Sequence, residues 1–139
     1  MIVLDTNVVS EPLRPTPNPQ VVEWIDAQAL DTLYLTAITV AELRFGIASL
    51  PVGKRRDRLL AGLERQLLPL FVGRVLPFDL PTSQAYGELM ANARVAGLAI
   101  SPADGYIAAT VLASGMKIAT RDTRPFKAAG VEVINPWHA

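Results

Sequence analysis

Residues 1–7, MIVLDTN, place a carboxylate directly after four apolar side chains. Residues 2–4 are expected to form a short buried strand that ends at Asp5. A charge at the end of a buried strand needs a partner or a metal ion, because burying it bare costs several kcal/mol. Asp5 is therefore a candidate metal ligand. The alternative is an ion pair, or a turn that Asp5 forms with Thr6 and Asn7.

A second carboxylate follows a second apolar run. Residues 117–120, KIAT, indicate a strand, and Asp122 comes two residues later, either as a site residue or as an ordinary turn residue. Three further apolar runs alternate with helical patterns, at residues 33–35, 75–78 and 131–134. Helical patterns begin near Pro19, Thr39 and Ser101, cover about 53–68 and 82–96, and leave a turn or short helix at 124–128. This alternation predicts an α/β fold with a parallel sheet covered on both faces. Pro77 favours an edge position for the run at 75–78.

Two more carboxylates lie at expected helix starts. Glu42 comes three residues after Thr39, and Asp104 comes three residues after Ser101. Both pairs match a capping box, so each acid could serve only to cap its own helix and to complement the helix dipole. Each could equally point into a functional site.

The joint placement of these acids is the main functional signal. Ligands of parallel sheets bind beyond the carboxyl ends of the strands, where two of the acids are expected. We therefore predict one site formed by four acids, Asp5, Glu42, Asp104 and Asp122. Carboxylates a few ångströms apart repel one another, so such a cluster is either protonated or loaded with metal. Mg²⁺ and Mn²⁺ prefer carboxylate and water oxygens, and either ion can activate water against a phosphodiester.

Three polar residues next to the acids are candidates for orienting them, namely Thr6, Asn7 and Thr120. The alternative for each is ordinary hydrogen bonding at a turn or strand end. Four arginines also lie near the acids in sequence, Arg14, Arg44, Arg121 and Arg124. They could contact phosphate or could form ion pairs that relieve the acidic cluster. The basic run at 54–58 is either an RNA-facing patch or a solvated helix face.

Composition limits the other possibilities. The 139 residues suit one domain, 1–139, and contain no cysteine, which excludes disulfides, thiol catalysis and thiolate metal sites. Thirteen basic and thirteen acidic side chains cancel, so any nucleic-acid binding must come from local patches or from a partner. Neither a signal peptide nor a membrane span is apparent, and a cytoplasmic protein is expected.

At these residues the chain resembles PIN-domain ribonucleases, and more closely the VapC-like toxins of type II toxin–antitoxin systems, especially the FitB type. The resemblance covers nearly the whole chain. It depends on five segments in the family's order: LDTN with SEP at 4–7 and 10–12, TVAEL at 39–43, ADGYIAAT at 103–110, ATRD at 119–122 and NPW at 135–137.

The resemblance implies a PIN-like three-layer sandwich, with a central, mainly parallel sheet flanked by helices. It implies an endoribonuclease that depends on Mg²⁺ or Mn²⁺, with the four acids as catalytic residues. Asp5, Asp104 and Asp122 would bind the metal ion, and Thr120 would be the family's hydroxyl residue. It further implies a homodimer, RNA as substrate, a small antitoxin as partner and DNA binding only through that antitoxin.

Two other functions are alternatives to that of a ribonuclease. An aspartyl-phosphate phosphotransferase of the haloacid-dehalogenase type needs a second acid two residues after its nucleophile, and Asn7 occupies that position. The stronger alternative is a mainly non-enzymatic protein, the partner of a DNA-binding antitoxin in an autorepressor complex.

Overall fold

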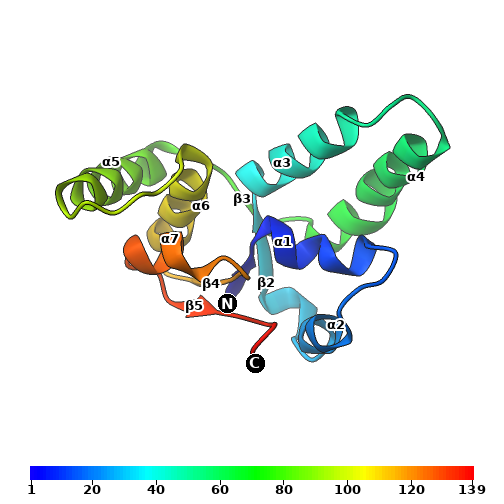
Figure 1. Cartoon of the computed structure of the whole chain (residues 1–139), viewed down its shortest axis with the longest axis horizontal. Coiled ribbons are helices and arrows are strands. Elements are labelled where there is room, and N and C mark those ends of the chain that lie inside the picture. Colours follow the sequence, from blue (N-terminus) through cyan, green and yellow to red (C-terminus); the bar gives the residue numbers. More distant parts are fainter.

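The computed structural model describes residues 1–139 and shows a five-stranded sheet with helices on both faces (Figure 1). The strands are β1 (Ile2–Leu4), β2 (Leu33–Thr36), β3 (Val75–Leu76), β4 (Lys117–Ala119) and β5 (Val133–Ile134). The helices are α1 (Thr6–Val9), α2 (Pro19–Asp26), α3 (Ala37–Ala48), α4 (Lys54–Gly62), α5 (Leu80–Val95), α6 (Pro102–Ala113) and α7 (Thr123–Ala128). Short 3₁₀ turns (Glu11–Leu13, Leu30–Thr32, Leu68–Phe71) and a π turn (Leu63–Leu67) lie in the connections.

The sheet is parallel throughout, in the order β3-β2-β1-β4-β5, which confirms the predicted α/β class. The first apolar run of the chain forms its central strand. β3 lies at an edge, as predicted, and ends before Pro77, which has no amide proton to donate to a ladder. β5 is shorter than the predicted run at 131–134, because the Val131 amide donates to the Phe126 carbonyl and closes the turn after α7.

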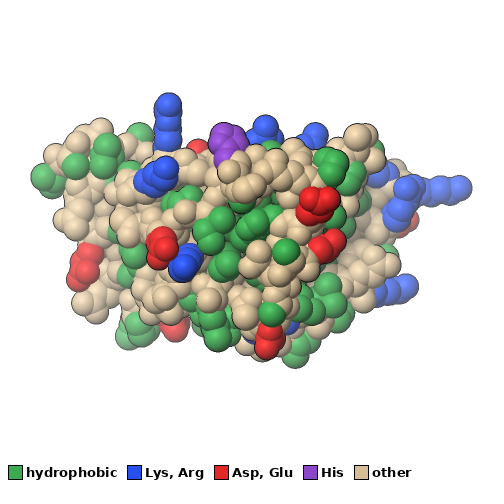
Figure 2. All heavy atoms as spheres, turned by 90° about the horizontal axis from the view of Figure 1, so that it is seen from below, with side chains coloured by type: hydrophobic (Ala, Val, Ile, Leu, Met, Phe, Trp, Pro, Cys, Tyr) green, Lys and Arg blue, Asp and Glu red, His purple; other side chains and the backbone are tan.

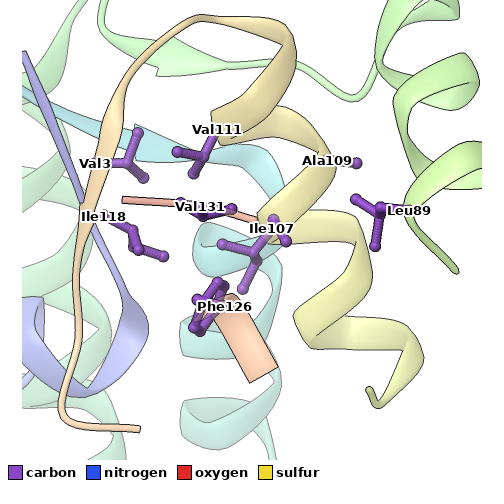
Figure 3. Close-up of a cluster of buried hydrophobic side chains, with 9 residues drawn as sticks. Val3, Leu89, Ile107, Ala109, Val111, Ile118, Phe126 and Val131 are labelled. Atoms are coloured by element: carbon purple, nitrogen blue, oxygen red, sulfur yellow. The ribbon is translucent and has the colours of Figure 1, made fainter. Parts of the chain in front are cut away.

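The two faces of the sheet carry separate cores. Val3 and Ile118 point to the side covered by α5, α6 and α7, where they pack with Ile107 and Phe126 (Figure 3). Leu4 and Ala119 point to the other side, toward α1, α2 and α3, and pack in a second cluster. Neighbouring residues of a strand point to opposite faces, so β1 and β4 contribute to both cores. This confirms the three-layer arrangement.

Two of the predicted helix starts are confirmed in detail. Asn18 caps α2, where its Oδ1 accepts a 2.9 Å hydrogen bond from the Gln20 amide. Ser101 caps α6, where its Oγ accepts a 3.2 Å bond from the Asp104 amide. Asp104 is therefore in the first turn of α6, where a negative charge complements the helix dipole.

The predicted start of α3 at Thr39 is wrong. The helix begins at Ala37, and Thr36 at the end of β2 is its cap, with Oγ1 accepting a 3.0 Å bond from the Thr39 amide. Glu42 therefore lies beyond the first turn, too far along the helix for a capping box. The strand ends one residue before the helix begins, so the hydroxyl that serves as cap belongs to the strand.

No helix combines the length and the apolar character that crossing a bilayer requires. On the face seen from below in Figure 1, acidic and basic side chains are interspersed, with apolar side chains between them (Figure 2). This distribution agrees with the net charge of zero. That face offers no continuous basic surface.

Candidate active site

The four predicted acids line one hollow at the carboxyl ends of the strands. Its volume is about 280 Å³, and its lining contains no hydrophobic residue. The lining residues are Asp5, Thr6, Asn7, Ser10, Glu42, Asp104 and Asp122. They come from α1 and the residues on either side of it, from α3, from α6 and from the link between β4 and α7. We call this hollow the acidic pocket.

Asp5 is the most enclosed of the four acids, with 6% of its surface exposed. It caps α1, where its Oδ1 accepts a 2.8 Å hydrogen bond from the Thr6 amide, and its Oδ2 accepts a 2.8 Å bond from the Thr120 hydroxyl. Burial raises the pKa of Asp5 from 3.8 to about 6; the two hydrogen bonds oppose the rise, and the negative charges of Asp104 and Glu42 add to it. The folded chain therefore holds a carboxylate in a place that disfavours its negative charge.

Thr120 and Asn7 connect the two strand ends beneath the pocket. Thr120 is fully buried, and its Oγ1 accepts a 3.1 Å bond from the Asp122 amide. Asn7 lies between the segments: its amide nitrogen is 3.4 Å from Thr120 Oγ1, and its Oδ1 accepts a 3.2 Å bond from the Arg121 amide. These contacts hold the loop after β4 against the start of α1. An orienting role of Thr120 and Asn7, as predicted, would depend on these hydrogen bonds.

Glu42 is exposed at the opposite wall of the pocket and is held by Thr6. The Thr6 hydroxyl donates a 2.9 Å bond to Glu42 Oε1. Behind Thr6 lie two fully buried hydroxyls: Thr39 Oγ1 is 3.5 Å from Thr6 Oγ1, and Thr36 Oγ1 donates to Thr39 Oγ1 at 3.2 Å. A chain of hydroxyl groups therefore runs from the end of β2 to Glu42.

None of the four acids has an ion-pair partner. Two of the four arginines pair elsewhere, Arg14 with Glu11 at 3.0 Å and Arg44 with Glu64. Arg121 lies over the Trp137 ring, 5.1 Å from its centroid. The prediction that these arginines could relieve the acidic cluster through ion pairs is therefore wrong. The four acids therefore have no positively charged side chain of the chain as a counterion.

The donor set fits a hard divalent ion. The pocket presents carboxylate and hydroxyl oxygens, which Mg²⁺ and Mn²⁺ prefer. No three of the acids form a ready cluster of metal ligands. Mg²⁺ does not need such a cluster, because it usually keeps several water molecules and binds through one or two carboxylates. Asp5, Asp104 and Asp122 line the pocket from three different segments, and one or two of them would be enough to hold such an ion.

A model of the PIN domain matches residues 2–132. The chain belongs to the PIN-domain family. The match covers every segment that contributes to the acidic pocket, from Asp5 to Asp122.

Among related proteins, this PIN domain is 63% identical over 139 residues to the plasmid stability protein StbB of Pseudomonas syringae pv. tomato, with 100% of both chains covered. It is 59% identical over 137 residues to the VapC ribonuclease Y4jK of Sinorhizobium fredii, covering 99% of the chain and 98% of that protein. It is 54% identical over 138 residues to the toxin FitB of Neisseria gonorrhoeae, covering 99% of each.

Two solved structures have the same fold. The crystal structure of FitAcB from Neisseria gonorrhoeae superposes with a TM-score of 0.97 at 54% identity, with 100% of both chains covered. The structure of FitAB bound to an IR36 DNA fragment gives a TM-score of 0.97 at 53% identity, covering 100% of this chain and 97% of that one. The predicted family, with its VapC- and FitB-like branch, is confirmed.

Three residues of this PIN domain's site were not predicted as parts of it. Ser10 lines the acidic pocket and donates a 2.6 Å bond to the Thr6 carbonyl. Thr36 and Thr39 support Glu42 from below. Thr36 is the last residue of β2, and this position at a strand end is a sequence signal like the one that pointed to Asp5. Ser10 follows Thr6 by four residues, the spacing that brings helical side chains to one face.

Proposed function

We propose that this PIN domain is a metal-dependent endoribonuclease, the toxin of a toxin–antitoxin pair, and that it hydrolyses RNA phosphodiesters in the acidic pocket. The observation that carries the proposal is a polar hollow lined by four acids that no cation of the chain neutralises. The choice of RNA is supported by the 59% identity to a protein named a VapC ribonuclease. The toxin assignment is supported by the 54% identity to the toxin FitB.

The chain's own residues divide the work. Asp5, Asp104 and Asp122 would supply the carboxylates that hold a divalent ion, and Asp5 is kept in position by the Thr120 hydroxyl and the Thr6 amide. Glu42, held by Thr6, accepts a hydrogen bond from the attacking water. When bound, Mg²⁺ or Mn²⁺ supplies a hydroxide from water and polarises the scissile phosphate. Asn7 and Thr120 keep the two strand ends at a constant separation.

Cleavage of labelled RNA tests this function. Purified protein in Mn²⁺ should cleave the RNA, EDTA should abolish cleavage, and Asp5→Asn should abolish it too, because the variant removes a ligand charge with almost no change in shape. Glu42→Gln is a second variant at an exposed position, where loss of folding is not expected. Equal activity of wild type and Asp5→Asn would identify a contaminating nuclease and refute the proposal.

The partners we propose are a small antitoxin and a second copy of the chain. A mostly apolar groove of about 350 Å³ adjoins the acidic pocket at Thr6 and Glu42 and lies between α3 and α4. We assign this groove to the antitoxin segment. Large apolar side chains are exposed on α3 and α5, among them Phe45 at 74% and Val95 at 90%, and suit contact with a second copy.

A mainly non-enzymatic role is the second candidate, and one specific finding favours it. The FitAB structure, whose matching chain is 53% identical, was solved with DNA. In that role the acidic pocket would only receive a basic side chain of the antitoxin, and DNA would be bound through the antitoxin. Absence of RNA cleavage in Mn²⁺, combined with tight binding of the complex to its own promoter, would favour this role.

A further inference from the structure

A second hollow begins where the acidic pocket ends. Its volume is about 670 Å³, and it shares Asp104 and Asp122 with the acidic pocket. From there it extends along α7, whose Arg124 and Lys127 line it. We call it the α7 hollow. Because Asp104 and Asp122 line both hollows, the two adjoin, with Asp5 and Glu42 in the acidic pocket and the cations in the α7 hollow.

The two cations of the α7 hollow are free to bind a ligand. Arg124 and Lys127 are both exposed, and neither takes part in an ion pair or a side-chain hydrogen bond. They are three residues apart on α7, so their side chains lie on the same face of the helix, with Cβ atoms about 5–6 Å apart. The neighbouring residues Pro125 and Phe126 are buried and hold the helix against the core.

The opposite side of the acidic pocket has a different character. There the groove between α3 and α4 is lined mainly by apolar and uncharged side chains, with Arg55 as its one basic residue. Both surfaces adjoin the acids, so each offers a path for a phosphodiester strand whose scissile phosphate lies there. Since the chain carries no net charge, the attraction has to be local, and the α7 hollow supplies it.

We propose that single-stranded RNA leaves the acidic pocket along the α7 hollow, where Arg124 and Lys127 bind the phosphates next to the scissile one. This proposal deepens the proposed function and rests on it. Arg124 can form two parallel hydrogen bonds to one phosphate, and Lys127 contributes a single positive charge. Both are binding residues that act equally on the ground state and the transition state. An acidic peptide is the competing ligand for the same two charges.

Salt-dependent binding gives the sharpest test. The measurement is fluorescence anisotropy of a labelled single-stranded RNA in Mg²⁺, with Asp5→Asn in all chains so that the RNA stays intact. Each phosphate contact on a single strand contributes about 0.7 to the slope of log affinity against log salt. Arg124→Gln with Lys127→Gln should therefore lower the slope by about 1.4. The ratio of the RNA affinity of the parent chain to that of the double variant should fall about sevenfold between 50 and 200 mM salt.

A matched control removes two positive charges elsewhere. Arg65→Gln with Lys117→Gln changes two residues that line neither hollow, and Lys117 lies at the start of β4, away from the carboxyl ends of the strands. This control should leave the slope unchanged. In the Asp5-containing chain, the Arg124 and Lys127 double variant should raise KM and leave kcat unchanged, the result expected when uniform binding is lost.

The outcomes separate this inference from the proposed function. A wild-type chain that binds and cleaves RNA, with an unchanged slope in the double variant, would overturn the inference alone. A chain that neither binds nor cleaves RNA would overturn both. Equal slope changes in the test and control variants would show a diffuse charge effect and would also overturn it. If a labelled poly-glutamate peptide needs the two cations and RNA does not, the hollow is a peptide site.

Discussion

The hydroxyl of Thr120 donates a 2.8 Å hydrogen bond to Oδ2 of Asp5, across 115 residues of sequence. The bond joins the ends of two neighbouring strands. It also lowers the pKa of Asp5, which burial nevertheless keeps raised, at about 6. We expect Thr120→Val to raise the pKa of Asp5 further. At a pH above that pKa, the variant should be less stable than wild type by about 1.5–3 kcal/mol, the usual contribution of a hydrogen bond to a charged group. Thr120→Ser keeps the hydroxyl and should behave like wild type. Urea unfolding at pH 8 distinguishes them.

The raised pKa of Asp5 makes the stability of the metal-free chain depend on pH. The folded state holds the proton of the Asp5 carboxyl group more tightly than the unfolded chain, in which the pKa of this group is near 3.8. The contribution of Asp5 to stability therefore falls as pH rises from about 4 to 6. The difference between the two pKa values corresponds to about 3 kcal/mol of free energy. Asp5→Asn carries no charge and should be more stable than wild type above pH 6, by up to about 3 kcal/mol.

Unfolding in EDTA across pH 4 to 8 checks this expectation. The stability difference between Asp5→Asn and wild type should vanish toward pH 4 and reach its full size above pH 6. The comparison of two chains cancels the other titrating groups, including Asp79, whose hydrogen bonds with Thr82 lower its pKa. A difference that is constant over this range would contradict the assignment to Asp5.

Divalent metal should reverse the destabilising effect of the acidic pocket. If the folded chain binds Mg²⁺ and the unfolded chain does not, a concentration of 100 times Kd stabilises the fold by about 2.7 kcal/mol. The melting temperature should then rise by several degrees, measured at pH 8. Asp104→Asn should reduce the shift, while Lys117→Gln should leave it intact. An unchanged melting temperature at millimolar Mg²⁺ would argue against a cation site.

The buried hydroxyl chain behind Glu42 offers a matched pair of variants. Thr39→Val keeps the shape of the side chain and removes the hydroxyl that lies 3.5 Å from Thr6 Oγ1, whereas Thr39→Ser keeps the hydroxyl. Changes to groups that orient metal-site residues typically cost 10–100-fold in affinity or activity. We expect a loss of about tenfold in kcat/KM for Thr39→Val and near wild-type activity for Thr39→Ser. Equal rates for both would show that the hydroxyl has no orienting effect.

Gly105 allows α5 and α6 to approach closely beside Asp104. A Cβ at this position would lie 2.7 Å from Met90 Sδ and 3.0 Å from Tyr86. Gly105→Ala should therefore destabilise the chain by about 1–3 kcal/mol. In a chain that already carries Met90→Ala, the same substitution should cost less, because the closest atom has been removed. A double-mutant cycle by urea unfolding measures this coupling. Additive effects would show that Met90 is not the source of the cost.

Several parts of this structure follow from local patterns. The apolar run before Asp5 predicted β1, and the helical pattern from Pro19 predicted the start of α2. Pro77 predicted the edge position of β3. In each case the deciding interaction lies within a few residues of sequence, or depends only on burial. The convergence of the four acids was predicted as well, because parallel strands end at one edge of their sheet.

The remaining details depend on contacts between distant residues. The capping pattern pointed to Thr39 as the start of α3, but β2 ends at Thr36 and the helix begins directly after it, so Thr36 is the cap. The support of Glu42 by Thr6 joins two helices and could not be inferred from either helix alone. Arg124 and Lys127 of α7 lie beside the acidic pocket only in the folded chain, where the α7 hollow shares Asp104 and Asp122 with that pocket.

The placement of β1 between β2 and β4 has a consequence for how the protein is made. Asp5 is synthesised long before β4, the strand that pairs with β1 and ends at Ala119. A nascent polypeptide still attached to the ribosome therefore lacks half of the four acids until Asp104 and Asp122 have been translated. We expect premature termination anywhere before Thr120 to yield an inert fragment, so interrupted translation would release no partial toxin into the host.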